Sequence, residues 1–314
     1  MATVLEVIQA TRAYLAKHGV ENPRLNSEHL LAYILGQKRI DLYLGADRLL
    51  AEAELNPLRE LVRRRARREP LQHLLGTVEF FGRTFSIDSR ALIPRPETEQ
   101  LVEFILARPF PPEPSILDVG TGSGIIALTL AVEIEKSAVT AIDISGEALE
   151  LARHNAGKLG LEERVSFLQG DLLEGITDSF DILVANLPYI PTDLLPGLAE
   201  EVRHDPKLAL DGGADGLSLI TRLLCSAPPH LNSGGLLALE IGHDQSERLI
   251  AELEARVDCG CGNGEFHTKE RAPTKARRIA SQGYSRSRAF APAVRRRTEA
   301  ECDWGSQNRN HQRA

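Results

Sequence analysis

The chain has 314 residues and a net charge of −7 at pH 7, and its 42 % hydrophobic and 26 % charged residues are ordinary for a globular protein. No apolar run approaches the roughly 18 residues of a membrane span, and aromatic residues at 5 % suggest no base-stacking surface for single-stranded nucleic acid. Residues 258–314 hold 12 Lys and Arg against 6 Asp and Glu, a net +6 that leaves −13 on residues 1–257, and such an acidic body disfavours broad contact with nucleic-acid backbone.

Cysteine content and the first residues bear on the compartment. Four cysteines are too few for a disulfide scaffold in a chain of this length. Glu6, Arg12 and Lys17 interrupt the apolar residues near the start, so we expect no signal-peptide hydrophobic region. These features predict a cytoplasmic protein.

Residues 1–75 are predicted to be helical throughout. The first helix repeats its apolar residues at a spacing of 3.6 and is expected to end near Gly19. Its apolar face is formed by Val4, Ile8, Thr11 and Leu15. The Asn-Ser pair at residues 26–27 predicts the start of a second helix, which ends at Gly36. The Asn-Pro pair at residues 56–57 predicts the N-cap and the first residue of a third helix.

The third helix runs into a basic segment, Arg-Arg-Arg-Ala-Arg-Arg at residues 63–68. Such a run predicts a solvated helix face, and contact with RNA or with an acidic partner is the alternative. Residues 77–89 then give two short strand-like segments around Gly82, which predict a β-hairpin. We therefore expect a helical domain over residues 1–75 and a hairpin linker over residues 76–90.

From residue 115 onward, short β-rich apolar runs alternate with helical stretches. Strands are predicted at residues 116–119, 138–142, 165–168, 181–185 and 236–241. A helix is predicted at residues 145–159, with Ser145 as its N-cap and Gly160 as its stop. This alternation predicts an α/β fold over residues 91–257, with a mainly parallel sheet and helices on both faces. Ligands bind such sheets outside the carboxyl ends of the strands.

Residues 258–314 differ in character from the rest of the chain. They are rich in Arg, Ser and Ala and show no sustained period of 2 or 3.6, which predicts a disordered tail. Cys259, Cys261 and His267 do not complete a set of four ligands at a finger-like spacing, so no metal is expected.

A glycine-rich loop follows the first strand of the α/β region. Its pattern is D-x-G-x-G-x-G, from Asp118, Gly120, Thr121, Gly122, Ser123 and Gly124. Glycines there allow a tight turn and let a ligand lie against bare backbone beside a helix N-terminus, although a purely structural turn is the alternative. The spacing resembles the S-adenosylmethionine loop of class I methyltransferases, not the G-x-G-x-x-G of dinucleotide folds. That resemblance implies that Asp118 helps to orient a cationic ligand.

Two acidic residues follow the next two strands. Asp143 comes directly after the second strand, 19 residues beyond Gly124. A carboxylate in that place can accept two hydrogen bonds from a ribose diol, or it can cap the following helix. Asp171 follows the third strand, where it can reach the adenine end of the same ligand, with an ordinary turn as the alternative. We expect both residues to bind the cofactor.

The fourth strand ends in Asn186-Leu187-Pro188-Tyr189. This segment resembles the [N/D/S]-x-P-[Y/F/W] motif of methyltransferases that act on planar, conjugated nitrogens, and an Asn-x-Pro turn is the alternative. The lone pair of such a nitrogen is delocalised, so the site must orient the NH₂ group more than it must supply a base. The Asn186 side-chain oxygen and the Leu187 carbonyl can accept both N–H groups. Pro188 stiffens the loop and Tyr189 packs against the flat group, so catalysis rests on positioning.

Four further segments carry a more specific resemblance. They are residues 69–76 (EPLQHLLG), 79–85 (EFFGRTF), 92–99 (LIPRPETE) and 205–217 (DPKLALDGGADGL). Together they closely resemble the release-factor glutamine N5-methyltransferase family of the PrmC/HemK type, over about residues 1–257. The resemblance implies a class I, Rossmann-like methyltransferase sheet with a small N-terminal all-helical domain that grips the release factor. It also implies S-adenosyl-L-methionine as cofactor and, as substrate, the glutamine of the Gly-Gly-Gln loop of class I peptide-chain release factors.

Carried over by motif, the resemblance assigns the cofactor to the glycine loop, Asp143, Asp171 and Asn186, and the glutamine amide to residues 186–189. It leaves Arg95 and Glu97 either to order a loop over the cofactor or to form a structural ion pair. This chain has Leu187 where the family has a second proline, a form that resembles rRNA adenine dimethyltransferases. The two strands that close the family's sheet are not expected after residue 257.

Two alternatives stay open. A base N6-methyltransferase acting on rRNA or DNA would suit Asn-Leu-Pro-Tyr and the basic segment, and the acidic body opposes it. A catalytically silent protein that binds release factors would suit the absence of the closing strands. We expect a monomeric enzyme with no membrane partner and no major nucleic-acid partner.

Overall fold

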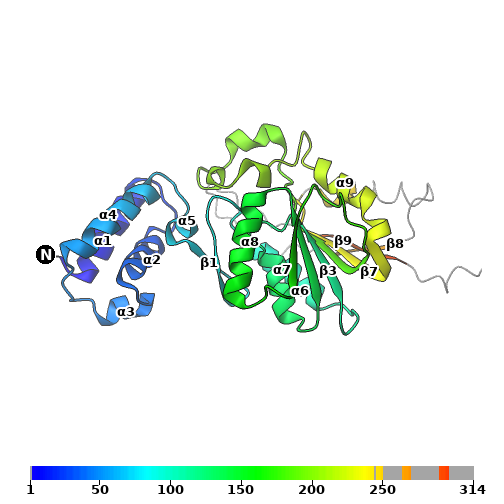
Figure 1. The fold of residues 1–314 in the computed structure, drawn as a ribbon. Helices are drawn as coiled ribbons and strands as arrows, with labels where there is room; N and C mark the ends of the chain where they lie inside the picture. The colour runs from blue at the N-terminus through cyan, green and yellow to red at the C-terminus, as the bar shows by residue number, and fades with distance from the viewer. Residues whose placement is uncertain (1, 244, 250–263, 270–289, 297–314) are drawn as a thin grey trace, which may run out of the picture. The chain divides into compact units, whose positions relative to one another are not determined.

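A computed structural model describes residues 2–243, 245–249, 264–269 and 290–296 (Figure 1). The chain forms two compact units. Unit 1 contains Met1–Pro94 and Leu194–Leu210, and unit 2 contains Arg95–Asp193 and Asp211–Ala314. We call Leu194–Leu210 the inserted segment, because unit 2 contains the residues on either side of it in the sequence. The domain boundaries expected at residues 75, 90 and 257 stay predictions.

Unit 1 is mainly helical. Its helices are α1 (Val4–Lys17), α2 (Pro23–Leu35), α3 (Arg39–Leu44), α4 (Glu52–Ala66) and α5 (Leu71–Leu75), and the inserted segment adds short 3₁₀ turns η1 (Thr192–Gly197), η2 (Val202–His204) and η3 (Lys207–Ala209). The predicted apolar face of α1 is confirmed, since its four residues are all buried. Gly36 ends α2 in the left-handed conformation, as predicted.

The predicted starts of the second and third helices are wrong. α2 begins at Pro23, so Asn26 and Ser27 lie inside the helix, where their side chains donate hydrogen bonds to backbone carbonyls of the preceding residues. Such local bonds allow residues that favour N-caps to sit within a helix. α4 begins at Glu52 and contains Pro57. Glu54 fixes this earlier start, because its carboxylate accepts a hydrogen bond from the backbone N–H of Ala51 at 2.9 Å.

The basic segment is only in part the solvated face that the sequence predicts, because Arg63 and Arg67 are exposed whereas Arg65 is buried and Arg68 is partly buried. Arg65 is only 5 % exposed, and its Nε donates to the Asn26 side chain at 2.7 Å. Its Nη2 atom lies 3.1 Å from a carboxylate oxygen of Glu201, and Arg68 pairs with the other oxygen of Glu201 at 2.8 Å. The acidic partner of these two arginines is therefore the inserted segment of the same chain.

The predicted hairpin is confirmed. β1 (Thr77–Phe80) and β2 (Arg83–Ser86) pair antiparallel, with Phe80 opposite Arg83. The two turn residues, Phe81 and Gly82, both have positive φ, 49° and 71°. This is the conformation of a two-residue turn whose twist matches that of the strands.

Unit 2 is built on a parallel sheet, which confirms the α/β prediction. Its strands are β3 (Ser115–Val119), β4 (Ala138–Asp143), β5 (Val165–Gln169), β6 (Phe180–Ala185) and β7 (Leu231–Leu239). They lie side by side in the order β5-β4-β3-β6-β7, all parallel. Each contains or overlaps a predicted strand, and the largest difference is β7, which begins five residues earlier than expected.

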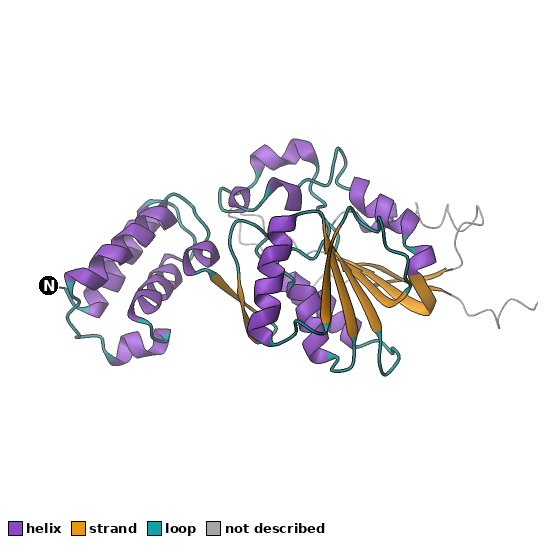
Figure 2. Ribbon diagram, viewed as in Figure 1, coloured by secondary structure: helices purple, strands orange, loops and turns teal. Residues whose placement is uncertain are grey.

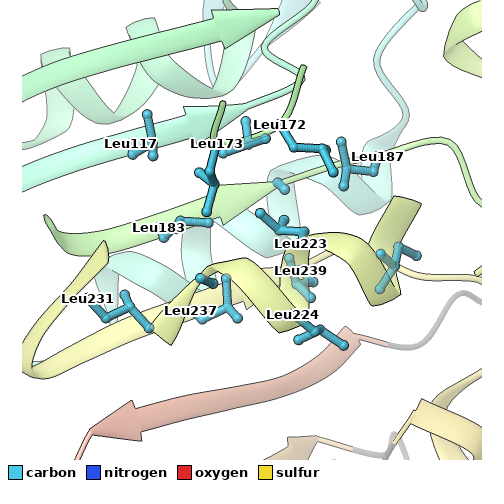
Figure 3. Close-up of a cluster of buried hydrophobic side chains, with 14 of the residues drawn as sticks. Leu117, Leu172, Leu173, Leu183, Leu187, Leu223, Leu224, Leu231, Leu237 and Leu239 are labelled. Atoms are coloured by element: carbon cyan, nitrogen blue, oxygen red, sulfur yellow. The ribbon is translucent and has the colours of Figure 1, made fainter. Parts of the chain in front are cut away.

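Helices cover both faces of this sheet (Figures 1 and 2). They are α6 (Pro96–Leu106), α7 (Ile125–Glu133) and α8 (Gly146–Leu159) on one face, and α9 (Ser218–Ser226), followed by η4 (Pro228–His230), on the other. Figure 3 shows the core on the α9 face, where alternate residues of β3, β6 and β7 such as Leu117, Leu183 and Leu237 meet α9. Within the described ranges, no helix is long and apolar enough to cross a bilayer.

Two strands in the C-terminal region correct the prediction that residues after 257 add nothing to the sheet. β9 (Phe290–Arg296) pairs antiparallel with β7, and β8 (Gly264–Lys269) pairs antiparallel with β9. Pairing uses backbone groups that every strand edge offers, so it does not require an alternating side-chain pattern. The shift in register between His267 and Lys269 falls opposite Pro292, and a bulge is where a strand tolerates proline. The rest of the expected tail lies outside the described residues.

Candidate active site

The sheet brings the predicted site residues to one edge. Val119, the last residue of β3, pairs with Ile142 of β4 and with Ala185 of β6. Asp143, the last residue of β4, and Asn186, which follows β6, therefore lie beside the glycine loop. The chain runs outward from β3 to β4 and β5 and then crosses back to β6 and β7 on the other side of β3, so a topological switch point lies between β3 and β6. Ligands bind open α/β sheets at such points.

The glycine loop has the geometry that its composition predicts. Gly120, Gly122 and Gly124 all have positive φ, between 57° and 79°. A Cβ on Gly120 would lie 2.9 Å from the Leu187 side chain, and one on Gly124 would lie 3.0 Å from the Cβ of Ala152. The loop therefore packs closely against Leu187 and against α8, which only glycine at these positions allows.

Asp118 lies fully buried under the loop. Its Oδ2 accepts hydrogen bonds from the Thr121 hydroxyl at 2.6 Å and from the backbone N–H of Ala127 at 3.1 Å. Its Oδ1 is buried and has no hydrogen-bond partner in the part of the chain that the structure describes. Burial, with a smaller contribution from the nearby Asp143, raises the pKa of Asp118 to about 7. The free oxygen is an acceptor that a cationic or N–H-bearing ligand would satisfy.

The other polar loop residues point inward. Thr121 is 5 % exposed, and its hydroxyl is already bonded to Asp118. Ser123 is 3 % exposed, and its carbonyl accepts a hydrogen bond from Asn155 at 3.0 Å. Both residues shape the loop, and contact between their backbone and the cofactor stays a prediction.

Asp143 joins the end of β4 to the glycine loop. Its Oδ2 accepts a hydrogen bond from the backbone N–H of Gly122, and its Oδ1 accepts one from the backbone N–H of Ser145, both at 2.8 Å. Burial raises the pKa of this carboxyl, and those backbone hydrogen bonds oppose the rise. Ser145 in turn caps α8, as predicted. The contact of Asp143 with a ribose diol stays a prediction.

Asp171 is engaged by a basic side chain. Its Oδ2 lies 2.8 Å from Nη2 of Arg222, which comes from α9. The pair is partly exposed, with 34 % of the Asp171 side chain accessible. The predicted contact of Asp171 with adenine is untested by this geometry, which leaves its Oδ1 for such a contact.

The Asn186–Tyr189 loop starts where β6 ends. The Asn186 Nδ2 donates to the hydroxyl of Thr98 at 3.3 Å. Its Oδ1 is buried, and none of the described residues donates to it. Leu187 is 5 % exposed and belongs to the core cluster labelled in Figure 3. Thr98 thus holds the amide group of Asn186 through its nitrogen, and the Oδ1 of Asn186 is left as an acceptor.

Several residues that support this loop were not identified from the sequence. Gln245 donates to the carbonyl of Tyr189 at 2.9 Å. A Cβ on Gly212 would lie 2.7 Å from the Pro188 carbonyl oxygen, and one on Gly216 would clash with the Tyr189 carbonyl. The D-G-G-A-D-G segment therefore packs directly behind the loop, and its glycine content was the available signal.

In the Pro-Arg-Pro-Glu-Thr-Glu segment, Thr98 contacts Asn186. Arg95 is the N-cap of α6 and Glu97 lies in its first turn. Their expected roles in ordering a loop over the cofactor stay predictions.

The chain is similar to known proteins in both of its parts. The PrmC N-terminal domain family matches residues 6–76, and a methyltransferase domain family matches residues 112–211. The chain is 44 % identical to the release factor glutamine methyltransferase of Geobacter sulfurreducens, over 82 % of this chain and 91 % of that protein. It is 48 % identical to the same enzyme of Moorella thermoacetica, over 74 % of this chain and 83 % of that protein.

Among solved structures, the hMettl16 catalytic domain in complex with MAT2A 3′UTR hairpin 6 shares the fold. The TM-score is 0.51 at 15 % identity, over 78 % of this chain and 82 % of that chain. The fold and the switch-point site define a class I methyltransferase that uses S-adenosylmethionine as methyl donor. With relatives at this identity over most of its length, the chain belongs to the release factor glutamine methyltransferase family.

Proposed function

We propose that this enzyme methylates the side-chain amide nitrogen (N5) of the glutamine in the Gly-Gly-Gln loop of class I release factors. The observation that carries the proposal is the Oδ1 of Asn186, a buried acceptor without a described donor, at the switch point of the sheet. An acceptor there suits a substrate group that has N–H to donate. The relatives are named release factor glutamine methyltransferases, which supports the substrate class.

The residues present fit the methyl donor. The three glycines of the loop have positive φ and lead into the N-terminus of α7, and the buried Oδ1 of Asp118 has no hydrogen-bond partner among the described residues. We assign the cofactor to the residues of this loop together with Asp143, Asp171 and Asn186. When bound, S-adenosylmethionine supplies an electrophilic methyl group on a sulfonium centre.

The protein's own contribution is positioning. An amide nitrogen is a poor nucleophile because its lone pair is delocalised into the carbonyl. The Asn186 Oδ1 and the Leu187 carbonyl accept the two N–H groups and turn the nitrogen toward the methyl donor. Both acceptors also stabilise the positive charge that develops on the nitrogen. Pro188 stiffens the loop, and Tyr189 packs against the planar amide. The buried side chain of Leu187 excludes water from this side of the loop.

A base N6-methyltransferase is the second candidate, because Asn-Leu-Pro-Tyr resembles the motif of rRNA enzymes. The basic segment does not support it, since Arg65 and Arg68 pair with Glu201 inside unit 1. The decisive assay incubates the protein with labelled methyl donor, purified release factor and rRNA together. Label on the glutamine of the release factor supports the proposal, and label on rRNA alone refutes it.

A silent binding protein would transfer no label to either and is excluded by the same assay. We place the enzyme in the cytoplasm, because release factors act on cytoplasmic ribosomes. We also propose that it is a monomer. Sedimentation of the purified protein with and without release factor tests the oligomeric state.

A further inference from the structure

Asn186 stands at the end of a chain of hydrogen bonds that leads to a buried carboxylate. The Asn186 Nδ2 donates to Thr98 Oγ1 at 3.3 Å, and Thr98 Oγ1 donates to Glu240 Oε2 at 2.8 Å. Thr98 and Glu240 are each 1 % exposed. The three residues come from three elements: the end of β6, the first turn of α6 and the residue after β7.

Backbone hydrogen bonds order Glu240 and Thr98. The Glu240 N–H donates to the carbonyl of Ala185 at 3.0 Å, which places Glu240 beside the residue that precedes Asn186. The Thr98 N–H donates to the carbonyl of Arg95 at 3.0 Å in the first turn of α6. The first bond joins the end of β7 to the end of β6, and the second orders the turn of α6 that carries Thr98.

The direction of each bond follows from the groups themselves. A hydroxyl has one proton, and the Thr98 hydroxyl donates it to Glu240 Oε2. Thr98 gives its proton to Glu240, so it can offer Asn186 nothing but a lone pair. Asn186 must then present its NH₂ to Thr98, because a flipped amide would set oxygen against oxygen. Its Oδ1 is consequently turned the other way, where it is buried and without a described donor.

We propose that Glu240 and Thr98 are positioning residues that fix the side-chain amide of Asn186 with its oxygen toward the substrate. This inference rests on the proposed function and deepens it. A site locked as an acceptor admits an NH₂ group and disfavours a carboxylate, which has no proton to give. Glutamine is thereby preferred over glutamate, since a site built for one hydrogen-bonding partner rejects the isostere that lacks it.

The test compares Thr98→Val, which keeps the shape and removes the hydroxyl, with Thr98→Ser, which keeps the hydroxyl. Thr98→Val should lower kcat on release factor about tenfold, with less than about a twofold change in affinity for the methyl donor. Thr98→Ser should recover most of that loss. An unchanged kcat in folded Thr98→Val would overturn the proposal.

A double-mutant cycle separates positioning from general structural damage. In an Asn186→Ala background, Thr98→Val should cause no further loss of kcat, because the group that it orients is gone. The same cycle applies to Glu240→Gln, whose amide can donate to Thr98 and so remove the fixed direction. We call the hydrogen-bonded series from Glu240 through Thr98 to Asn186 the relay. A further loss of about tenfold in the Asn186→Ala background would refute it.

A readout that needs no activity keeps this inference distinct from the proposed function. The side-chain NH₂ of Asn186 should exchange slowly with solvent in NMR spectra, lose that protection in Thr98→Val and keep it in Thr98→Ser. If this pattern holds and release factor takes no label, the relay stands and the proposed function fails. If release factor is labelled and Thr98→Val leaves the exchange unchanged, the relay alone is wrong.

Discussion

Leu187 packs over Gly120, with its Cδ2 atom 2.9 Å from the position that a Cβ on Gly120 would occupy. The residue that departs from the family motif thus bridges two parts of the site, the glycine loop and the loop that begins at Asn186. Its side chain also belongs to the core cluster of unit 2 (Figure 3). The departure is therefore accommodated by packing, and the acceptor carbonyl of the position survives it.

Leu187→Pro should keep glutamine methylation and lower thermal stability. The main-chain carbonyl is unchanged, so chemistry is retained or improved by the stiffer loop, whereas a buried side chain that is 5 % exposed loses contacts. A loss of about 1–3 kcal/mol is expected, between the costs of small and large core truncations. Calorimetric melting and the label assay measure the two effects. Loss of glutamine methylation with rRNA methylation intact would show that the substrate assignment is wrong.

Asp143→Ala should weaken binding of S-adenosylmethionine by at least about tenfold, because it removes charge-assisted hydrogen bonds of about 1.5–3 kcal/mol each. It also releases the backbone N–H of Gly122, which Asp143 now accepts at 2.8 Å. Asp143→Asn is the matched control, since it keeps one acceptor oxygen and should lose less. Titration calorimetry gives both affinities. An unchanged affinity in folded Asp143→Ala would remove Asp143 from the cofactor site.

Asn186→Ala should cut kcat by roughly 10²–10³, the scale for losing a polar group that acts in the transition state. Affinity for the methyl donor should fall much less, because the glycine loop, Asp118 and Asp143 are untouched. Single-turnover rates, measured at saturating methyl donor, separate the two effects. Equal losses in rate and in donor affinity would assign Asn186 to donor binding alone.

The pKa of Asp118 predicts how stability varies with pH. Burial raises it from 3.8 to about 7, so between these values the folded protein holds a proton that the unfolded chain has released. The contribution of Asp118 to stability therefore falls as pH rises through this window. Asp118→Asn, which stays neutral, should remove that part of the dependence. Melting temperatures at pH 5 and pH 8 measure it, and an identical pH dependence in both proteins would contradict the raised pKa.

A positively charged ligand favours the ionised form of Asp118, so binding should release a proton and tighten as pH rises from 6 to 8. Calorimetric titrations in buffers of different ionisation enthalpy count that proton. Binding that is independent of pH in this range would mean that Asp118 does not face the charged part of the ligand.

Short sequence patterns were enough to predict the elements that are determined by neighbouring residues. The strands of the parallel sheet, the glycine turns and the Ser145 cap all follow from apolar runs and from residues with restricted or permissive backbones. The start of α2 was missed because the Asn26 side chain bonds a backbone carbonyl from inside the helix, which the sequence does not distinguish from an N-cap. The start of α4 was missed because Glu54 accepts from the backbone N–H of Ala51, three residues before it. Strands β8 and β9 were missed because backbone pairing at a sheet edge needs no side-chain period.

The residues behind the site could not be predicted for a different reason. Thr98 and Glu240 are 142 positions apart and meet only when α6 packs beside the end of β7. Nothing in the sequence near either residue specifies that contact. Arg65 and Glu201 are likewise 136 positions apart, so a run of arginines gives no sign that one of its members is buried in an ion pair.

That ion pair gives the last prediction, which concerns how the inserted segment is held in unit 1. Arg65 is 5 % exposed and burial lowers its pKa, while Glu201 partly restores it. Glu201→Gln would leave a buried guanidinium without its charged partner and should destabilise the protein by about 3 kcal/mol, the lower end for a broken buried pair. Glu200→Gln is the matched control. Its side chain is 60 % exposed and its two pairs are 3.7 and 3.8 Å long, so an effect under about 0.5 kcal/mol is expected. Urea denaturation of the two variants measures the difference. Arg65→Met with Glu201→Gln should recover part of the loss, since the more deeply buried of the two guanidinium groups is then removed. Equal effects of the two single substitutions would mean that Arg65 is solvated and that Glu201 does not hold the inserted segment.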